Sequence, residues 1–137
     1  MLLGMNAFLD HILLNVSNPK ISLPFYKELF VYLGYDIIRD DEEHIAARKG
    51  GTADFWIVQT EEKHVSGAFH RKTTGLNHLA FSVSSKEAVN VFYNEFLKPS
   101  GIKTLYDSPK HFPEYTENYY AVFFEDPDRI KLEVLFR

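Results

Sequence analysis

Two histidines and one glutamate in strand-like segments are the residue types of a metal site. His11 and His78 each lie in a run of alternating apolar residues, and Glu133 lies within a strongly apolar run near the C-terminus. A carboxylate in such a run is rarely buried without a partner, and a metal ion would supply one. Two imidazoles and one carboxylate form a facial triad that leaves coordination positions open for substrate. We therefore predict that these three residues bind one divalent ion: Zn, Fe, Mn or Ni.

Each of these residues taken alone has a simpler explanation. A single strand histidine is more often hydrogen-bonded or solvated than bound to a metal. Glu133 could equally be a rim carboxylate paired with Lys131 or Arg137. The metal site is favoured because the two histidines occupy the same place in an internal repeat.

The repeat has a constant offset of 67 residues, since 78 − 11 = 67. Residues 9–17 lie over residues 76–84, with Leu, His, Val and Ser identical in both segments. The offset continues through three further matches: Phe25-Tyr26 with Phe92-Tyr93, Glu28 with Glu95, and Gly34 with Gly101. Self-similarity of this length predicts two copies of one structural unit.

Each copy reads as a strand, a helix and three further strands. The first helix is predicted over about 22–33, and a capping box at Ser84 and Glu87 is predicted to start the second. The later strands are predicted at 35–39, 43–48, 53–59, 103–106, 119–125 and 130–136. The fold class is therefore α+β, with two tandem βαβββ modules forming a curved sheet around a metal-binding cleft and the helices outside.

The whole chain, residues 1–137, is predicted to be one domain. Module one covers about 8–60, the linker 61–74 and module two about 75–137. If the modules pack about a pseudo-twofold axis, His11 and His78 can converge on one point. Trp56 and Phe124 are expected on or beside the sheets.

Composition narrows the possible functions. The 137 residues contain no cysteine, which excludes thiolate metal sites and cysteine nucleophiles. Fifteen basic and nineteen acidic residues give a net charge of −4 without a basic cluster, which disfavours nucleic acid as a partner. The N-terminus, residues 1–7, does not resemble a secretory signal, and no apolar run is long enough for a membrane span. A cytoplasmic protein that binds a small-molecule substrate is expected.

These motifs resemble those of the vicinal oxygen chelate superfamily, which includes glyoxalase I, extradiol dioxygenases, fosfomycin-resistance proteins and bleomycin-resistance proteins. The resemblance extends from Leu9 to Phe136. It is carried by the Leu-x-His openings, the Phe-Tyr helices, and the segments 54–57, 119–128 and 132–134. It implies a metal that chelates two oxygens of a substrate, with His11, His78 and Glu133 at three ligand positions of the family.

Two departures from the family pattern bear on activity. Arg129 stands where the family usually has glycine after Asp-Pro-Asp. Aligning Val58 with Val134 places Ile57 where glyoxalase I carries its first-half carboxylate, which argues against glyoxalase I activity. Gln59, Glu61 or Glu62 could substitute only if the strand register were slipped.

The leading functional hypothesis is a metal-dependent enzyme, lyase-like or dioxygenase-like, acting on a small oxygenated substrate. Thiol transfer to an epoxide, as in fosfomycin resistance, would use the same ligand types, but no phosphonate-binding cluster of lysine and arginine is evident. The candidates for proton transfer are Tyr115, Tyr119, Tyr120, His111 and His70.

The alternative is a metal-free binding protein similar to the bleomycin-sequestering members, with a cleft lined by aromatic residues. A dimerising scaffold is a third possibility. The family resemblance and the many aromatic residues predict a homodimer, in which His11 could meet His78 and Glu133 of the partner chain.

Overall fold

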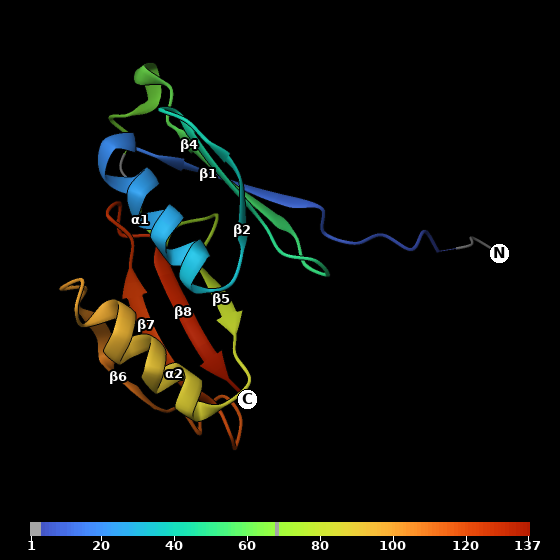
Figure 1. Cartoon of the computed structure of the whole chain (residues 1–137), viewed down its shortest axis with the longest axis vertical. Coiled ribbons are helices and arrows are strands. Elements are labelled where there is room, and N and C mark those ends of the chain that lie inside the picture. The colour runs from blue at the N-terminus through green and yellow to red at the C-terminus, as the bar shows by residue number, and fades with distance from the viewer. Residues whose placement is uncertain (1–3, 68) are drawn as a thin grey trace. The chain divides into compact units, whose positions relative to one another are not determined.

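The computed structural model describes residues 4–67 and 69–137 (Figure 1). The chain divides into two compact units, residues 1–65 and 66–137. In the described residues, each unit contains a four-stranded mixed sheet and a helix between its first and second strands, which confirms the α+β class with two βαβββ modules. Residues 1–3 of the segment tested for a secretory signal, and residue 68 of the predicted linker, lie outside the described residues.

The first unit has the strand order β1-β4-β3-β2, with β1 and β4 parallel and the other pairs antiparallel. A short 3₁₀ turn, Glu62–His64, follows its last strand. Its other elements are β1 (His11–Val16), α1 (Pro19–Tyr32), β2 (Asp36–Asp40), β3 (His44–Arg48) and β4 (Asp54–Gln59).

The second unit repeats this topology with the order β5-β8-β7-β6 and a parallel β5–β8 pair. Its helix continues into one π-helical turn, Tyr93–Leu97. Its other elements are β5 (His78–Ser82), α2 (Lys86–Phe92), β6 (Thr104–His111), β7 (Tyr120–Glu125) and β8 (Lys131–Phe136).

Both helices begin at residues other than those predicted. α1 starts at Pro19 because the Asn18 side chain accepts a hydrogen bond from the Lys20 amide at 3.1 Å, and proline suits the first helical position. Pro24 lies inside this helix instead of near its start. The predicted capping box is also wrong, because the cap of α2 is Ser85, whose Oγ accepts from the Ala88 amide at 3.0 Å.

Each helix covers one face of its own sheet. In the first unit the ring of Phe30 in α1 lies 5.1 Å from that of Phe55 in β4. In the second unit the ring of Phe92 in α2 lies 5.6 Å from that of Phe124 in β7. Because side chains alternate along a strand, each sheet directs every second residue away from its helix. No helix in the described part of the chain is long and apolar enough to cross a membrane.

The strand β6 is longer than predicted and contains a bulge. Pairing with β7 is interrupted between Leu105 and Lys110. Within the interruption, Tyr106 and Asp107 have φ angles of 59° and 52°. Non-glycine residues rarely adopt this left-handed conformation, so surrounding contacts must hold it.

The turn before β8 contains Arg129, the residue that departs from the family pattern. Arg129 adopts φ of 66°, the conformation that glycine adopts most easily. Asp126 organises the turn, because its Oδ1 accepts from the amides of Asp128 at 2.9 Å and Ile130 at 2.7 Å. The strand that carries Glu133 therefore begins at a well-defined place.

Candidate metal centre

Glu133 is a buried carboxylate with two partners. It lies in the middle of β8 and is only 1% exposed. The Tyr119 hydroxyl donates to Glu133 Oε1 at 2.5 Å, and Nε2 of His78 lies 3.1 Å from Oε2. The sequence expectation that this carboxylate requires a partner is met by these two side chains. Two of the three predicted ligands are thus in contact.

Strand register brings these residues together. In the parallel β5–β8 ladder His78 pairs with Lys131, and Ala80 pairs with Glu133. Positions two apart on a strand project to the same side, so His78 and Glu133 both leave the face of the sheet opposite α2. Phe123 pairs with Glu133 from β7, and its ring contacts the His78 ring at 6.3 Å.

His78 is oriented by the residue before it. Its Nδ1 lies 2.7 Å from Asn77 Oδ1. When an ion is bound, a neutral imidazole that donates from Nδ1 to this oxygen would turn the lone pair of Nε2 to the metal, in place of the Nε2–H that partners Glu133 without it. The side chain is 34% exposed, so a ligand can reach it from solvent.

The separation of the donor atoms of His78 and Glu133 is compatible with ligation of one divalent ion by both residues. Two ligands about 2.1 Å from one ion, at a right angle or the tetrahedral angle, lie about 3.0–3.4 Å apart. The separation of His78 Nε2 and Glu133 Oε2, 3.1 Å, falls in that range. Within residues 4–67 and 69–137, however, no group of three or more His, Cys, Asp or Glu side chains is placed to hold an ion.

His11 has the same local arrangement as His78 in its own unit. It is the first residue of β1, and its Nδ1 lies 2.6 Å from Asp10 Oδ2. Its side chain is 56% exposed. Asp10 and Asn77 are equivalent in the repeat, so both histidines have a side-chain oxygen of the preceding residue at Nδ1. Neither Asp10 nor Asn77 was predicted from the sequence, although each directly precedes a candidate ligand.

Trp56, not Ile57, occupies the position in the first unit that Glu133 occupies in the second. The two parallel ladders establish this equivalence. Leu13 of β1 pairs with Trp56, just as Ala80 of β5 pairs with Glu133. The first-unit position therefore carries an indole and no carboxylate.

The predicted alignment of Val58 with Val134 is accordingly wrong by one residue. Ile57, fully buried, is the true counterpart of Val134, because both lie on the face covered by the helix. Gln59 lies at the exposed end of β4. The absence of a first-half carboxylate was predicted from Ile57, which is not the equivalent residue. The equivalent residue, Trp56, has no carboxylate either.

Tyr119 is the one candidate for proton transfer that contacts Glu133 in the described part of the chain. Burial, and then its hydrogen bond to Glu133, raise the pKa of the Tyr119 hydroxyl well above its usual value. A phenol with a raised pKa stays protonated at neutral pH. Tyr119 therefore acts here as a hydrogen-bond donor.

The other four candidates have partners elsewhere. Tyr120 donates to an asparagine of α2, and His111 lies 3.1 Å from a lysine ammonium. His70 accepts from a backbone amide two residues on, and Tyr115 stacks on a neighbouring phenylalanine. None of these four contacts involves Glu133.

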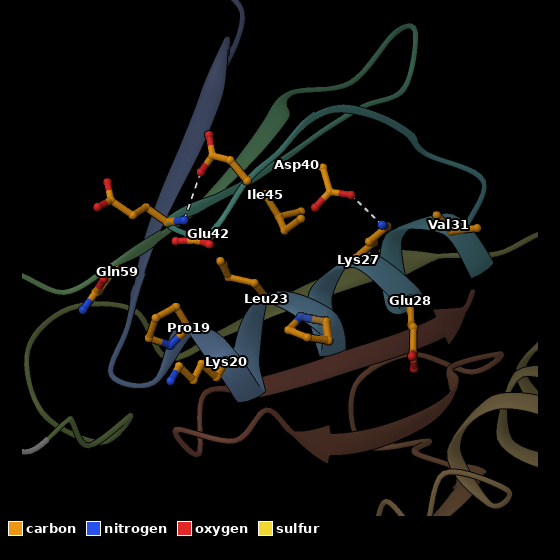
Figure 2. A pocket seen from close by; sticks show the side chains of 13 residues that line it. Pro19, Lys20, Leu23, Lys27, Glu28, Val31, Asp40, Glu42, Ile45 and Gln59 are labelled. Atoms are coloured by element: carbon orange, nitrogen blue, oxygen red, sulfur yellow. Dashed lines mark hydrogen bonds and ion pairs between the residues drawn. The ribbon is translucent and has the colours of Figure 1, made fainter.

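A separate groove of about 1,090 Å³ lies in the first unit between α1 and the β2–β3 turn (Figure 2). Its apolar wall includes Leu23 and Ile45, and an ion pair between Lys27 and Asp40 at 2.5 Å crosses its side (Figure 2). Ile45 lies on the helix-covered face of the sheet, whereas His11 lies on the opposite face. The groove contains no histidine and is distinct from the His11 position.

Comparison with known proteins identifies the family. A candidate glyoxalase from Bacillus halodurans, known from its crystal structure, is 37% identical, with a TM-score of 0.84 over 94% of this chain and 95% of that one. The uncharacterized protein YqjT of Bacillus subtilis is 36% identical over 93% of this chain and 97% of its own length.

The fosfomycin resistance protein FosX of Listeria monocytogenes shares the fold at 20% identity, with a TM-score of 0.67 over 97% of this chain and 95% of that one. The family model of the glyoxalase, bleomycin resistance protein and dioxygenase superfamily matches residues 8–134. This match covers nearly the whole chain and both modules. The chain belongs to the glyoxalase/bleomycin resistance protein/dioxygenase superfamily.

Proposed function

We propose that this protein is a metal-dependent enzyme that binds a small oxygenated substrate through His11, His78 and Glu133. The observation that carries the proposal is the pair of donor atoms His78 Nε2 and Glu133 Oε2, 3.1 Å apart. Asn77 supports it by its contact with His78 Nδ1. His11 is included because its own Nδ1 has the equivalent partner in Asp10.

A divalent ion, when bound, would act as a Lewis acid toward two oxygens of the substrate. The protein's own groups define how it would be held. Tyr119 occupies Glu133 Oε1, which leaves Oε2 as the carboxylate oxygen available beside His78. With Trp56 at the position equivalent to Glu133, the first unit offers no second carboxylate and no base there. Isomerisation of a hemithioacetal, the glyoxalase I reaction, is therefore disfavoured.

The test is metal analysis of protein purified without chelator and then loaded with a defined ion. We expect about one ion per chain, and loss of stoichiometric metal in His78→Ala, Glu133→Gln and His11→Ala. The exposed residues His64 and Glu117 offer matched controls, since His64→Ala and Glu117→Ala should retain the ion.

If the ion is retained in His78→Ala and Glu133→Gln, the metal site is wrong. If only His11→Ala retains it, His11 is not the third ligand. Circular dichroism of each variant checks that loss of metal is not loss of fold.

The alternative function is a metal-free protein that sequesters a small molecule. It is favoured by the aromatic residues around His78, where the rings of Phe123 and Tyr106 lie 5.3 Å apart edge to face. Binding of a ligand with the same affinity before and after chelator treatment would favour this alternative. Binding that requires the ion would favour the enzyme.

A homodimer is also part of the proposal. The segment before and within β1 exposes large apolar side chains: Met5, Phe8, Leu9 and Leu13. Large apolar side chains exposed within one short segment are typical of surfaces that become covered on assembly.

A further inference from the structure

Lys131 places a positive charge on the face of the sheet that carries the two donor atoms. It lies two residues before Glu133 on β8 and pairs with His78 across the β5–β8 ladder. Because residues two apart on a strand share a face, Lys131 leaves the sheet on the same side as Glu133. Its side chain is partly buried. The candidate metal centre therefore has a lysine as a direct neighbour.

The ammonium group of Lys131 lies over two aromatic rings. Nζ is 5.5 Å from the centroid of the Tyr106 ring and 5.5 Å from that of Phe123. The Phe123 ring also contacts the ring of His78. Ring faces attract a cation without neutralising its charge. The charge is thus held near the histidine and stays available to an anion.

The carboxylate of the residue that pairs with Lys131 on the neighbouring strand β7 already accepts hydrogen bonds from two arginines. Glu125 pairs with Lys131 in the β7–β8 ladder, but Arg71 donates to its Oε1 at 2.7 Å and Arg129 to its Oε2 at 3.3 Å. In residues 4–67 and 69–137, Lys131 makes no ion pair. A partly buried lysine without a carboxylate partner, next to a candidate ligand site, is suited to bind an anionic ligand group.

An unfavourable backbone conformation positions the side chain of Tyr106. Tyr106 and Asp107 both have positive φ within the bulge of β6. Bulges often redirect a side chain next to a functional site. Here the redirected ring is one of the two that hold the Lys131 ammonium.

We propose that Lys131 recognises a carboxylate group of the substrate whose chelating oxygens are held at His78 and Glu133. The substrate class is then a small organic acid with two adjacent oxygens for the metal and a separate anionic group for the lysine. This inference rests on the proposed function, because it requires the ligand to be chelated at that site.

The experiment compares two hydroxamates of equal chain length on the Zn²⁺-loaded protein by isothermal titration calorimetry. Succinohydroxamate ends in a carboxylate and butyrohydroxamate in a methyl group, and both chelate through the same two oxygens. We expect succinohydroxamate to bind at least roughly tenfold more tightly, as one charge-assisted hydrogen bond would give. This preference should weaken as the salt concentration rises.

Lys131→Met keeps an unbranched apolar side chain over the rings and removes the charge. It should abolish the preference for succinohydroxamate while leaving butyrohydroxamate affinity unchanged, and Lys131→Arg should restore it. Lys86→Met is the matched control, because Lys86 also lies over a tyrosine ring, 5.0 Å from that of Tyr120, on the helix-covered face. The control should keep the preference.

The two possible failures are distinguishable. If neither hydroxamate binds, or if His78→Ala binds both as well as the wild type does, the proposed function fails. If both bind in a metal-dependent way but with equal affinity, or if the preference survives in Lys131→Met, the role of Lys131 is wrong while the metal site stands. Chemical denaturation of Lys131→Met confirms that the comparison is between folded proteins.

Discussion

The Tyr119 hydroxyl donates a 2.5 Å hydrogen bond to Oε1 of Glu133, which is 1% exposed. Tyr119 directly precedes β7, and Glu133 lies in the middle of the neighbouring strand β8. The contact satisfies one oxygen of a buried carboxylate and directs the other toward His78. It therefore links the stability of the fold to the geometry of the candidate metal centre.

Replacing Tyr119 by Phe removes only the hydroxyl and should lower the free energy of unfolding by about 1–3 kcal/mol, because Glu133 Oε1 loses its donor. Urea denaturation measures this change. The matched control is Tyr115→Phe, since Tyr115 is exposed and its hydroxyl is not required at Glu133. Equal stability of the two variants would contradict the structural role of the Tyr119 hydroxyl.

Asn77→Ala should weaken metal binding roughly 10–100-fold, the usual effect of removing the partner of a ligating histidine. The physical reason is that Asn77 Oδ1, 2.7 Å from His78 Nδ1, would hold the proton on Nδ1 and leave Nε2 to a bound ion. Competition with a chelator of known affinity measures the change. Asn94→Ala, at an exposed helical position, serves as the control. Unchanged affinity in Asn77→Ala would show that this contact does not orient a ligand.

Metal-loaded protein should turn over methylglyoxal with glutathione only at background rate. Trp56 stands where Glu133 stands in the second unit, so no carboxylate is available there to act as ligand and base. Formation of the thioester, followed by absorbance, measures the reaction. A hydroxamate titration of the same sample verifies that the site is loaded. Efficient turnover would mean that another residue supplies the base.

The ion pair between Arg48 and Asp54 should make stability depend on pH in acid. Arg48 donates to both oxygens of Asp54, and these hydrogen bonds hold the pKa of that carboxyl below its ordinary value of 3.8. A lowered folded-state pKa stabilises the protein above the unfolded-state pKa, and the stabilisation is lost as the pH falls through the folded-state value.

The stability difference between the wild type and Arg48→Met should therefore be constant near neutral pH and shrink below about pH 4. Urea denaturation at a series of pH values measures it. In an Asp54→Asn background the effect of Arg48→Met should not vary with pH. A pH-dependent effect in that background would assign the dependence to another group.

Light scattering at micromolar protein concentration should give twice the monomer mass. The exposed apolar side chains of Phe8, Leu9 and Leu13 supply the reason, because covering them on association removes apolar surface from water. Leu13→Asp should shift the equilibrium toward monomer, whereas Val91→Asp, at an exposed apolar position in the other unit, should not. A monomer mass for the wild type would contradict the proposed dimer.

The fold could be predicted from the sequence because the internal duplication gives two independent readings of the same order of strands and helix. The constant offset of 67 residues places each strand and helix of one unit against a counterpart in the other. The limits of the elements were harder to predict. α1 begins before the predicted residue because Asn18 caps it, and a proline at position 24 did not prevent the earlier start. The bulge in β6 leaves no periodicity, so the strand was predicted to end at residue 106.

The candidate site could be predicted only in part. His78 and Glu133, which lie in contact in the structure, were selected because a strand histidine and a carboxylate in an apolar strand are unusual residues in those places. The register of β4 was misjudged because a single shared valine was used to align two strands, and strand pairing depends on the whole ladder. Asn77 and Lys131 were not predicted as site residues, since their importance comes from contacts across strands and not from their own segments.

The strands β2 and β6 are irregular, and each lies at an edge of its sheet. This irregularity affects whether molecules can associate through their sheet edges. β2 has a register shift between Ile37 and Arg39 and exposes charged side chains, and β6 has its bulge and Pro109. Addition of a strand from another molecule requires an unbroken row of evenly spaced backbone donors and acceptors. Neither edge presents such a row, so both disfavour the growth of intermolecular sheet. The chain is thereby protected at these two edges from the fibrous aggregation to which mixed sheets with regular edges are prone.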